Sequence, residues 1–269
     1  MRCEIEADEL DRIAAAVAGG PPPYYPTERL YLEQVTDLGG GRVLVPGGPW
    51  CAAVHPNRVA PPPGEVIDPW PAPGPDAAAL AEQWLADGGS VDQHGHRLHP
   101  HWRQLLADPR VGLPTGPGWH YRLGPSRTAA AVLLRDGGRE VLLIQRADNQ
   151  RWALPAGFLG PQDATVEDGA LRELGEETGL WVPDPRTSRL LELVPTGRQA
   201  TLHAWTELTV IRVEADAGWL AQAVPVRRDA AGEVLDAAWW PVDGLGELTM
   251  QHRHPDYIRA GVRDLRGEK

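Results

Sequence analysis

Three glutamates in one short helical segment constrain this chain more than any other feature. The segment Ala170 to Leu180 reads ALRELGEETGL, and a turn of about 100° per residue places Glu173, Glu176 and Glu177 within one arc roughly 100° wide. Glu177 projects beside the apolar side chain of Val166, at the edge expected to be buried. Like charges at this spacing destabilise a helix, and burial adds a desolvation cost. A divalent cation would offset both costs, whereas a solvated acidic face is the alternative interpretation.

The segments around the glutamates predict how this helix is held. Thr128–Leu134 and Glu140–Arg146 read as two strands joined by an Asp-Gly-Gly turn. A loop broken by proline and glycine follows, with the sequence RWALPAGF. Either Asp163 or Thr165 can then cap the acidic helix, and Gly179 ends it. The expected order is therefore strand, strand, loop, acidic helix and glycine stop.

This order and its residues resemble the Nudix box, whose pattern is G-x5-E-x7-R-E-U-x-E-E-x-G-U, where U is aliphatic. The second half of the pattern is matched at every fixed position by the segment RELGEETGL, which begins at Arg172. The loop between Gly157 and Arg172 is one residue longer than in the pattern, so the first glutamate of the box falls at Asp163 or Ala164. By this resemblance the chain is identified as a member of the Nudix hydrolase family.

The resemblance implies a metal-dependent reaction on a diphosphate. In this family the glutamates hold Mg²⁺ or Mn²⁺, which bridge the diphosphate while water attacks one phosphorus and a nucleoside monophosphate leaves. Hard cations suit this task because they neutralise phosphate charge and lower the pKa of a bound water. The implied metal ligands are the backbone carbonyl of Ala156 and the carboxylates of Glu173, Glu176 and Glu177. Arg172 is expected to orient the carboxylates, and Arg146 to reach a phosphate.

A strand expected at Thr201–Val213 offers a second group of candidates. Alternation places His203, Trp205 and Glu207 on one face, so that an aromatic surface lies beside a carboxylate. Such a face could stack adenine or ribose, with Glu207 acting as a catalytic base or a further metal ligand. An ordinary sheet face packed under a helix is the alternative. The substrate-binding residues expected in total are Arg146, Trp152, Arg172, Arg198 and Trp205.

The acidic helix and its neighbours occupy only the second half of the 269 residues. We expect a smaller N-terminal lobe over residues 1–121 that helps to close the substrate cleft, and a Nudix domain over residues 122–269 with an α+β fold, an α/β/α sandwich around a mixed sheet. Residues 56–75 are proline-rich and predict an extended crossing. The other elements expected are helices at Ala7–Ala18 and Asp76–Ala86 and strands at Arg29–Thr36, Gly41–Val45 and Val234–Trp240.

Composition limits the partners of the chain. A net charge of −11 opposes binding to a nucleic-acid polymer, whose affinity comes largely from neutralisation of phosphate by Lys and Arg, but it permits a metal-complexed nucleotide. The N-terminal segment has neither a basic region nor a long apolar run, so we expect no secretory signal, no membrane span and a cytoplasmic protein. Cys3 and Cys51 indicate no disulfide framework. The sequence does not indicate an oligomeric state.

Four histidines in the segment DQHGHRLHPH, Asp92 to His101, are the residue type that transition metals bind. The segment is interrupted by glycine and proline, contains no cysteine and has no second group of ligands at a suitable spacing. We therefore interpret it as a solvated or structural loop and expect no metal there.

The segments VGLPTGPGWHYRLGPSRTAAAVL, HAWTEL and MQHRHPDYI are similar to segments of the two-lobed ADP-ribose pyrophosphatases. We therefore expect a Mg²⁺-dependent hydrolase (Mn²⁺ is also possible) that cleaves ADP-ribose to AMP and ribose 5-phosphate. Two alternatives stay open. One is a Nudix hydrolase of NAD(H), of a modified NAD-derived dinucleotide or of a nucleotide sugar. The other is a Nudix-like ligand sensor without catalysis, which the intact glutamate pattern disfavours.

Overall fold

The structure is a computed structural model, and it describes residues 5, 7–19, 28–46, 76–120, 123–195, 197, 199–226 and 232–268. Several features singled out in the sequence lie outside the described residues: the proline-rich segment 56–75, both cysteines and Arg198. The expected domain boundary between residues 121 and 122 lies outside them as well.

The chain forms two compact units that are not continuous in sequence. The first unit comprises residues 1–126 together with Val194–Glu207, and the second comprises Arg127–Leu193 and Leu208–Lys269. The return of Val194–Glu207 to the first unit carries no sequence pattern that would have revealed it.

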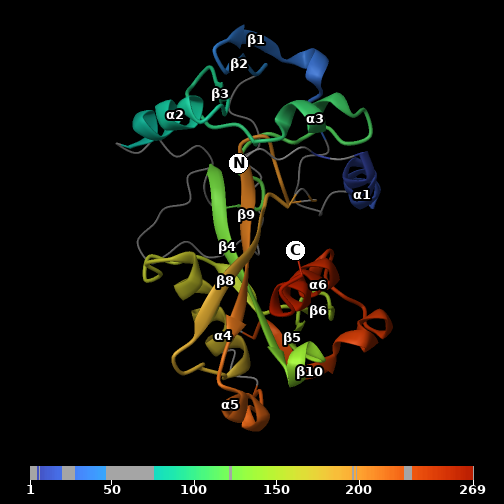
Figure 1. Cartoon of the computed structure of the whole chain (residues 1–269). Helices are drawn as coiled ribbons and strands as arrows, with labels where there is room; N and C mark the ends of the chain where they lie inside the picture. Colours follow the sequence, from blue (N-terminus) through green and yellow to red (C-terminus); the bar gives the residue numbers. More distant parts are fainter. Residues whose placement is uncertain are drawn as a thin grey trace. The chain divides into compact units, whose positions relative to one another are not determined.

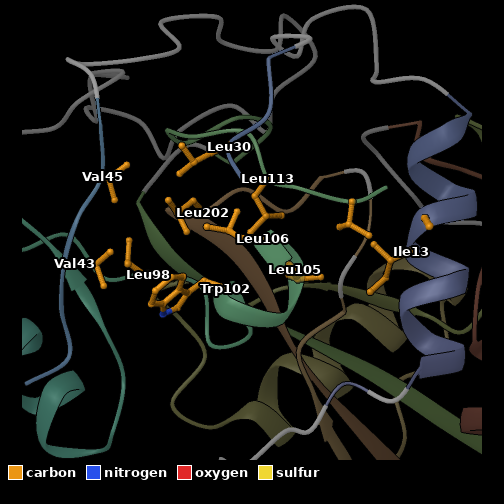
Figure 2. Packing of buried hydrophobic residues seen from close by; sticks show 12 residues of the cluster. Ile13, Leu30, Val43, Val45, Leu98, Trp102, Leu105, Leu106, Leu113 and Leu202 are labelled. Atoms are coloured by element: carbon orange, nitrogen blue, oxygen red, sulfur yellow. The ribbon is translucent and has the colours of Figure 1, made fainter. Parts of the chain in front are cut away.

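The first unit is built from short elements around one apolar cluster (Figures 1 and 2). Its elements are α1 (Ala7–Ala18), the 3-10 helix η1 (Leu32–Gln34), β1 (Thr36–Gly39), β2 (Arg42–Leu44), α2 (Ala77–Ala86), β3 (Val91–Asp92) and α3 (Trp102–Ala107). Strand β2 pairs antiparallel with β1 and parallel with β3. The cluster combines Ile13 of α1, Trp102 and Leu105 of α3, and Leu202 of the returning segment, as Figure 2 shows. Side chains that are distant in sequence thus complete a single core.

The second unit contains a seven-stranded sheet with five strands in the order β10-β5-β4-β9-β8 (Figure 1). The bounds are β4 (Gly124–Arg135), β5 (Glu140–Arg146), β8 (Arg186–Leu193), β9 (Ala204–Glu214) and β10 (Val234–Pro241). The first residues of β4, up to Ser126, and of β9, up to Glu207, belong to the first unit. Two short strands, β6 (Trp152–Ala153) and β7 (Ala156–Phe158), pair with β5 and β4 respectively. The connection between β4 and β5 is the 3-10 turn η2 (Asp136–Gly138), in which Gly137 and Gly138 have φ values of 64° and 84° that favour glycine.

Helices cover both faces of this sheet, and alternation along β4 accounts for the two layers. Ala129, Ala131 and Leu133 pack against α4 (Val166–Thr178), while Ala130, Val132 and Leu134 pack toward α6 (His254–Leu265). Helix α5 (Ala217–Gln222) and the 3-10 helix η3 (Val242–Glu247) complete the unit. The expected α/β/α sandwich is therefore confirmed, and Figure 1 shows α4 and α6 on either side of the sheet.

Most predicted elements are present, with one exception. Helix α1 and strand β5 have the expected bounds, and α2, β2 and β10 differ from them by a residue or so at their ends. The strand expected at Arg29–Thr36 is wrong: Leu30 makes only an isolated bridge to Leu113, and η1 follows. Among the described residues, none of the helices has the length and apolar character needed to cross a membrane.

Candidate active site

Helix α4 carries the predicted glutamates, and its ends are fixed by local interactions. Thr165 is the N-cap: its hydroxyl accepts the N–H of Asp168, whose carboxylate accepts the N–H of Thr165 in return, each at 3.0 Å. Gly179 ends the helix with a left-handed φ of 72°. Of the two capping residues that the sequence allowed, Thr165 is thus the one used.

Glu177 is the most buried of the three glutamates, as its position beside Val166 predicted. It is 9% exposed, and its Oε2 accepts the backbone N–H of Ala156 at 2.9 Å. Burial, followed by the negative charge of Glu173, raises the pKa of Glu177 well above its usual range. A buried carboxylate with one hydrogen-bond donor is costly to hold in its charged form.

Glu173 lies against the loop that precedes the helix. Its carboxylate occupies the space that a Cβ at residue 157 would need, so any residue other than glycine would displace the carboxylate from the loop. Burial raises the pKa of Glu173, whereas the adjacent Arg172 lowers it. The glycine of the predicted pattern thus has a steric explanation: it allows a carboxylate to approach the loop backbone closely.

Arg172 ties the helix to the loop and holds two of the glutamates. Its Nη1 lies 2.8 Å from Glu173 Oε1 and 2.8 Å from Glu176 Oε2. Its Nε and Nη2 donate to the two carboxylate oxygens of Asp163, each at 2.9 Å, and Nη2 also donates to the carbonyl of Phe158.

Asp163 supplies the first carboxylate of the pattern, which the sequence had left between residues 163 and 164. Its side chain is 2% exposed, and it accepts the N–H of Gly160 at 2.7 Å. The hydrogen bonds from Arg172 lower the pKa of Asp163. The loop therefore accommodates its extra residue. The side chain of Asp163 is shorter than the glutamate of the pattern, and it still reaches Arg172, which ties the helix to the loop.

The three glutamates offer carboxylate oxygens, which are the ligands that a hard divalent cation prefers. Glu173 and Glu177 also repel each other at the buried edge of the helix, and a cation would relieve this repulsion. Within the described residues, no three His, Cys, Asp or Glu side chains converge as they stand on one metal position. Arg172 holds Glu173 and Glu176 at present, and Glu176 is 53% exposed. Metal ligation by these residues and by the Ala156 carbonyl stays a prediction.

Arg146 and Trp152, two of the predicted substrate-binding residues, belong to the second unit and precede the glutamate helix in the sequence. Arg146, the last residue of β5, donates through Nε and Nη2 to Asp148 at 2.9 and 3.0 Å. Its charge also acts on Glu177. Trp152 of β6 is partly buried, and its ring meets that of Trp240 edge to face at a centroid distance of 5.1 Å. Their contacts with a substrate stay predictions.

Trp205 and Glu207 belong to the first unit. Trp205 is fully buried, and its ring packs against those of Trp84 and His99 at centroid distances of 5.7 and 5.6 Å. Its indole N–H donates to Glu207 at 3.3 Å. The ring therefore belongs to the interior of this unit, as the alternative of an ordinary sheet face would have it, and offers no face to a nucleobase.

Two interactions near the site had no signal in the sequence. The imidazole Nδ1 of His254, at the start of α6, accepts the N–H of Leu154 at 2.8 Å and so fixes the loop that leads to Ala156. Burial, followed by the charge of Arg146, lowers the pKa of His254 to about 3, which keeps the ring neutral. The other is Glu233, whose backbone carbonyl accepts the N–H of Ala147 at 2.7 Å. Both pairs join residues far apart in the chain, which no local periodicity reveals.

Comparisons with known proteins identify the family of the chain. The family model of the NUDIX domain matches residues 125–260. "MutT-like protein" of Streptomyces ambofaciens is 49% identical over 57 residues, which are 21% of this chain and 36% of that relative, so the chain spans little more than a third of its length. "Putative nudix hydrolase 6" of Caenorhabditis elegans is 25% identical over 203 residues, or 69% of this chain and 75% of that relative.

Solved structures show similarity over about half of the chain. The NUDIX domain of Shewanella oneidensis NrtR, crystallised with ADP ribose, has a TM-score of 0.43 and 24% identity, with 53% of this chain and 89% of that chain covered. A NUDIX hydrolase from Nitrosomonas europaea has a TM-score of 0.39 and 21% identity, with 54% and 92% covered.

Proposed function

The chain belongs to the Nudix family, and from this premise we propose that it is a hydrolase that cleaves the diphosphate of ADP-ribose to AMP and ribose 5-phosphate with Mg²⁺ or Mn²⁺. The observation that carries the proposal is the environment of Glu177. A buried carboxylate beside a second carboxylate, with its pKa raised, is a costly arrangement that a cation would relieve.

Each residue of the site has a part in this reaction. A bound divalent cation supplies the charge that neutralises the diphosphate and lowers the pKa of the attacking water. Glu173, Glu176 and Glu177 would hold it, with the Ala156 carbonyl as a further ligand. Exposed Glu176 can turn toward the cation while Arg172 keeps its bonds to Asp163, so that the helix stays fixed.

Arg146 is the residue that we assign to a substrate phosphate. It lies at the end of β5, and its guanidinium is bound by exposed Asp148, a carboxylate that a phosphate group can replace through the same pair of donors. Trp152 is the aromatic residue that we assign to the substrate near this end of the sheet.

The choice of ADP-ribose rests on the segments VGLPTGPGWHYRLGPSRTAAAVL, HAWTEL and MQHRHPDYI, which are similar to segments of the two-lobed ADP-ribose pyrophosphatases. The metal site by itself recognises a diphosphate and does not distinguish ADP-ribose from NADH or a nucleotide sugar. A contribution of the N-terminal residues to substrate binding is part of the same proposal.

The test is product analysis. The purified full chain is incubated with Mg²⁺ and one substrate at a time: ADP-ribose, NADH or a nucleotide sugar. The products of each reaction are separated by chromatography. We expect the highest kcat/KM for ADP-ribose, with AMP and ribose 5-phosphate formed in equal amounts. A higher value for NADH or the sugar would change the substrate, and tight binding without turnover of any of them would contradict hydrolysis.

A further inference from the structure

Glu233 stands at the edge of the glutamate site because of backbone pairing. Strands β10 and β5 are antiparallel, and Val234 is opposite Arg146 in their register. The carbonyl of Glu233 accepts the N–H of Ala147 at 2.7 Å. These two contacts fix the residue before β10 next to the end of β5, where the candidate phosphate-binding arginine lies.

Electrostatic interactions place the Glu233 carboxylate within range of both sides of the site. It acts on Arg146, and it is among the charges that raise the pKa of Glu177, after burial and Glu173. The residue is exposed to solvent. Its carboxylate therefore shares its surroundings with the buried glutamate and the arginine while it remains accessible to water.

Glu233 differs from its neighbours in having no fixed partner. Glu177 is bound by the N–H of Ala156, Glu173 and Glu176 share Arg172, and Asp148 is bound by Arg146. In the described part of the chain, the Glu233 side chain makes no hydrogen bond or ion pair. A carboxylate without such partners is free to accept a proton, whereas carboxylates committed to Arg172 or to a cation are poor acceptors.

We propose that Glu233 is the catalytic residue that accepts the proton of the attacking water. This inference rests on the proposed function. The water oxygen bonds to one phosphorus of the diphosphate, and its proton passes to the Glu233 carboxylate. The bond from that phosphorus to the bridging oxygen breaks, and its electron pair stays on the leaving phosphate. The proton on Glu233 then returns to solvent, so that the net reaction consumes one water.

The experiment compares three single variants of the full chain: Glu233→Gln, Glu207→Gln and Glu247→Gln. Glu247 is an exposed glutamate in η3 and serves as the matched control. We expect Glu233→Gln to lower kcat for ADP-ribose by about 10²- to 10⁴-fold, with KM changed less than about threefold. The control Glu247→Gln should stay within about threefold of the wild type, and Glu207→Gln tests the rival carboxylate that the sequence also allowed as a base.

Two further measurements separate proton transfer from a structural or ligand role. Calorimetry with Mg²⁺ alone, and with ADP-ribose in metal-free buffer, should give the same affinities for Glu233→Gln as for the wild type, and the two should share one melting temperature. Added formate should restore part of the activity of Glu233→Ala, because it supplies the missing carboxylate.

Each outcome decides the matter. Near-wild-type kcat in Glu233→Gln would overturn the assignment, and so would a large loss in Glu207→Gln alone. Lost Mg²⁺ or ADP-ribose affinity in Glu233→Gln would overturn it too, since the residue would then be a ligand. If the wild type hydrolyses no diphosphate in the substrate panel, the proposed function itself fails, and the role of Glu233 fails with it.

Discussion

The glutamates of α4 and the Asp92–His101 segment are both groups of ionisable side chains at spacings that suggest metal binding, yet their environments differ. Asp92, in the first unit, is 3% exposed. It accepts the N–H groups of His94 and His96, both at 2.8 Å, and the ring Nδ1 of His96 at 2.9 Å. The ring Nε2 of His203 lies 3.4 Å away. The Asp92 carboxylate is thus surrounded by donors.

Glu177 has one donor by comparison, and the pKa values of the two carboxylates move in opposite directions. Burial raises the pKa of Asp92, but contacts with His203 and His96 outweigh it and hold the pKa well below its usual range. Burial and Glu173 raise the pKa of Glu177. The comparison teaches that a group of ligand-type residues indicates function when its charge is left uncompensated. The Asp92 carboxylate, whose charge is compensated by its donors, is by contrast a structural group.

The largest effect expected is that of Glu177→Gln on turnover. The change keeps the shape and an acceptor for the Ala156 N–H but removes the charge, so we expect kcat to fall by about 10²- to 10⁴-fold while the protein stays folded. Steady-state kinetics with ADP-ribose and a melting curve measure both. Near-wild-type turnover would remove Glu177 from the metal ligands.

Asp92→Asn should instead lower the stability of the fold. The amide cannot accept from all the donors around it, so we expect a loss of about 2 kcal/mol in the free energy of unfolding, measured in urea. Asp76→Asn is the control, because Asp76 is exposed and makes no side-chain cap to α2. Equal stability of the two variants would mean that the Asp92 bonds are not structural.

Mild acid should change the free energy of unfolding in opposite directions through Glu177 and through the buried histidines His99 and His203. The folded pKa of Glu177 lies above 4.5, so the folded chain binds this proton first, and lowering the pH stabilises the fold. Burial lowers the pKa of His99 and His203 below 6.5, so the unfolded chain binds their protons first, and stability falls as the pH drops below about 6.5. Each titrating side chain contributes at most about 1.4 kcal/mol per pH unit.

The variant Glu177→Gln isolates the first of these contributions. It should be more stable than the wild type in urea at pH 7.5, and the difference should shrink toward pH 5 as Glu177 takes up its proton. A difference that stays constant over this range would show that Glu177 does not titrate there.

The smallest effect expected is thermal stabilisation by Mg²⁺ or Mn²⁺ in the presence of nucleotide. A ligand at ten times its Kd stabilises the folded state by about 1.4 kcal/mol. The shift in Tm should persist in Asp92→Asn and vanish in Glu177→Gln. A shift lost in Asp92→Asn instead would place the cation at the histidine loop and reverse the comparison.

The part of this structure that the sequence predicted is the part coded by local patterns. The acidic helix, its glycine stop, the strands on either side and the burial of Glu177 follow from periodicity and turn residues. The enclosure of Trp205 does not, because alternation along a strand gives the face of a side chain and not what covers that face. The bond from His254 to Leu154 joins residues a hundred positions apart, and such contacts leave no local pattern.

The return of Val194–Glu207 to the first unit has a consequence for the order in which the protein is made. Leu202 belongs to the same apolar cluster as Ile13 and Leu30, so that core is incomplete until about three-quarters of the chain has left the ribosome. Domains usually fold from the N-terminus first during synthesis. Here the N-terminal half must wait for residues encoded after the glutamate helix, so we expect both halves of the chain to acquire their folds late and together.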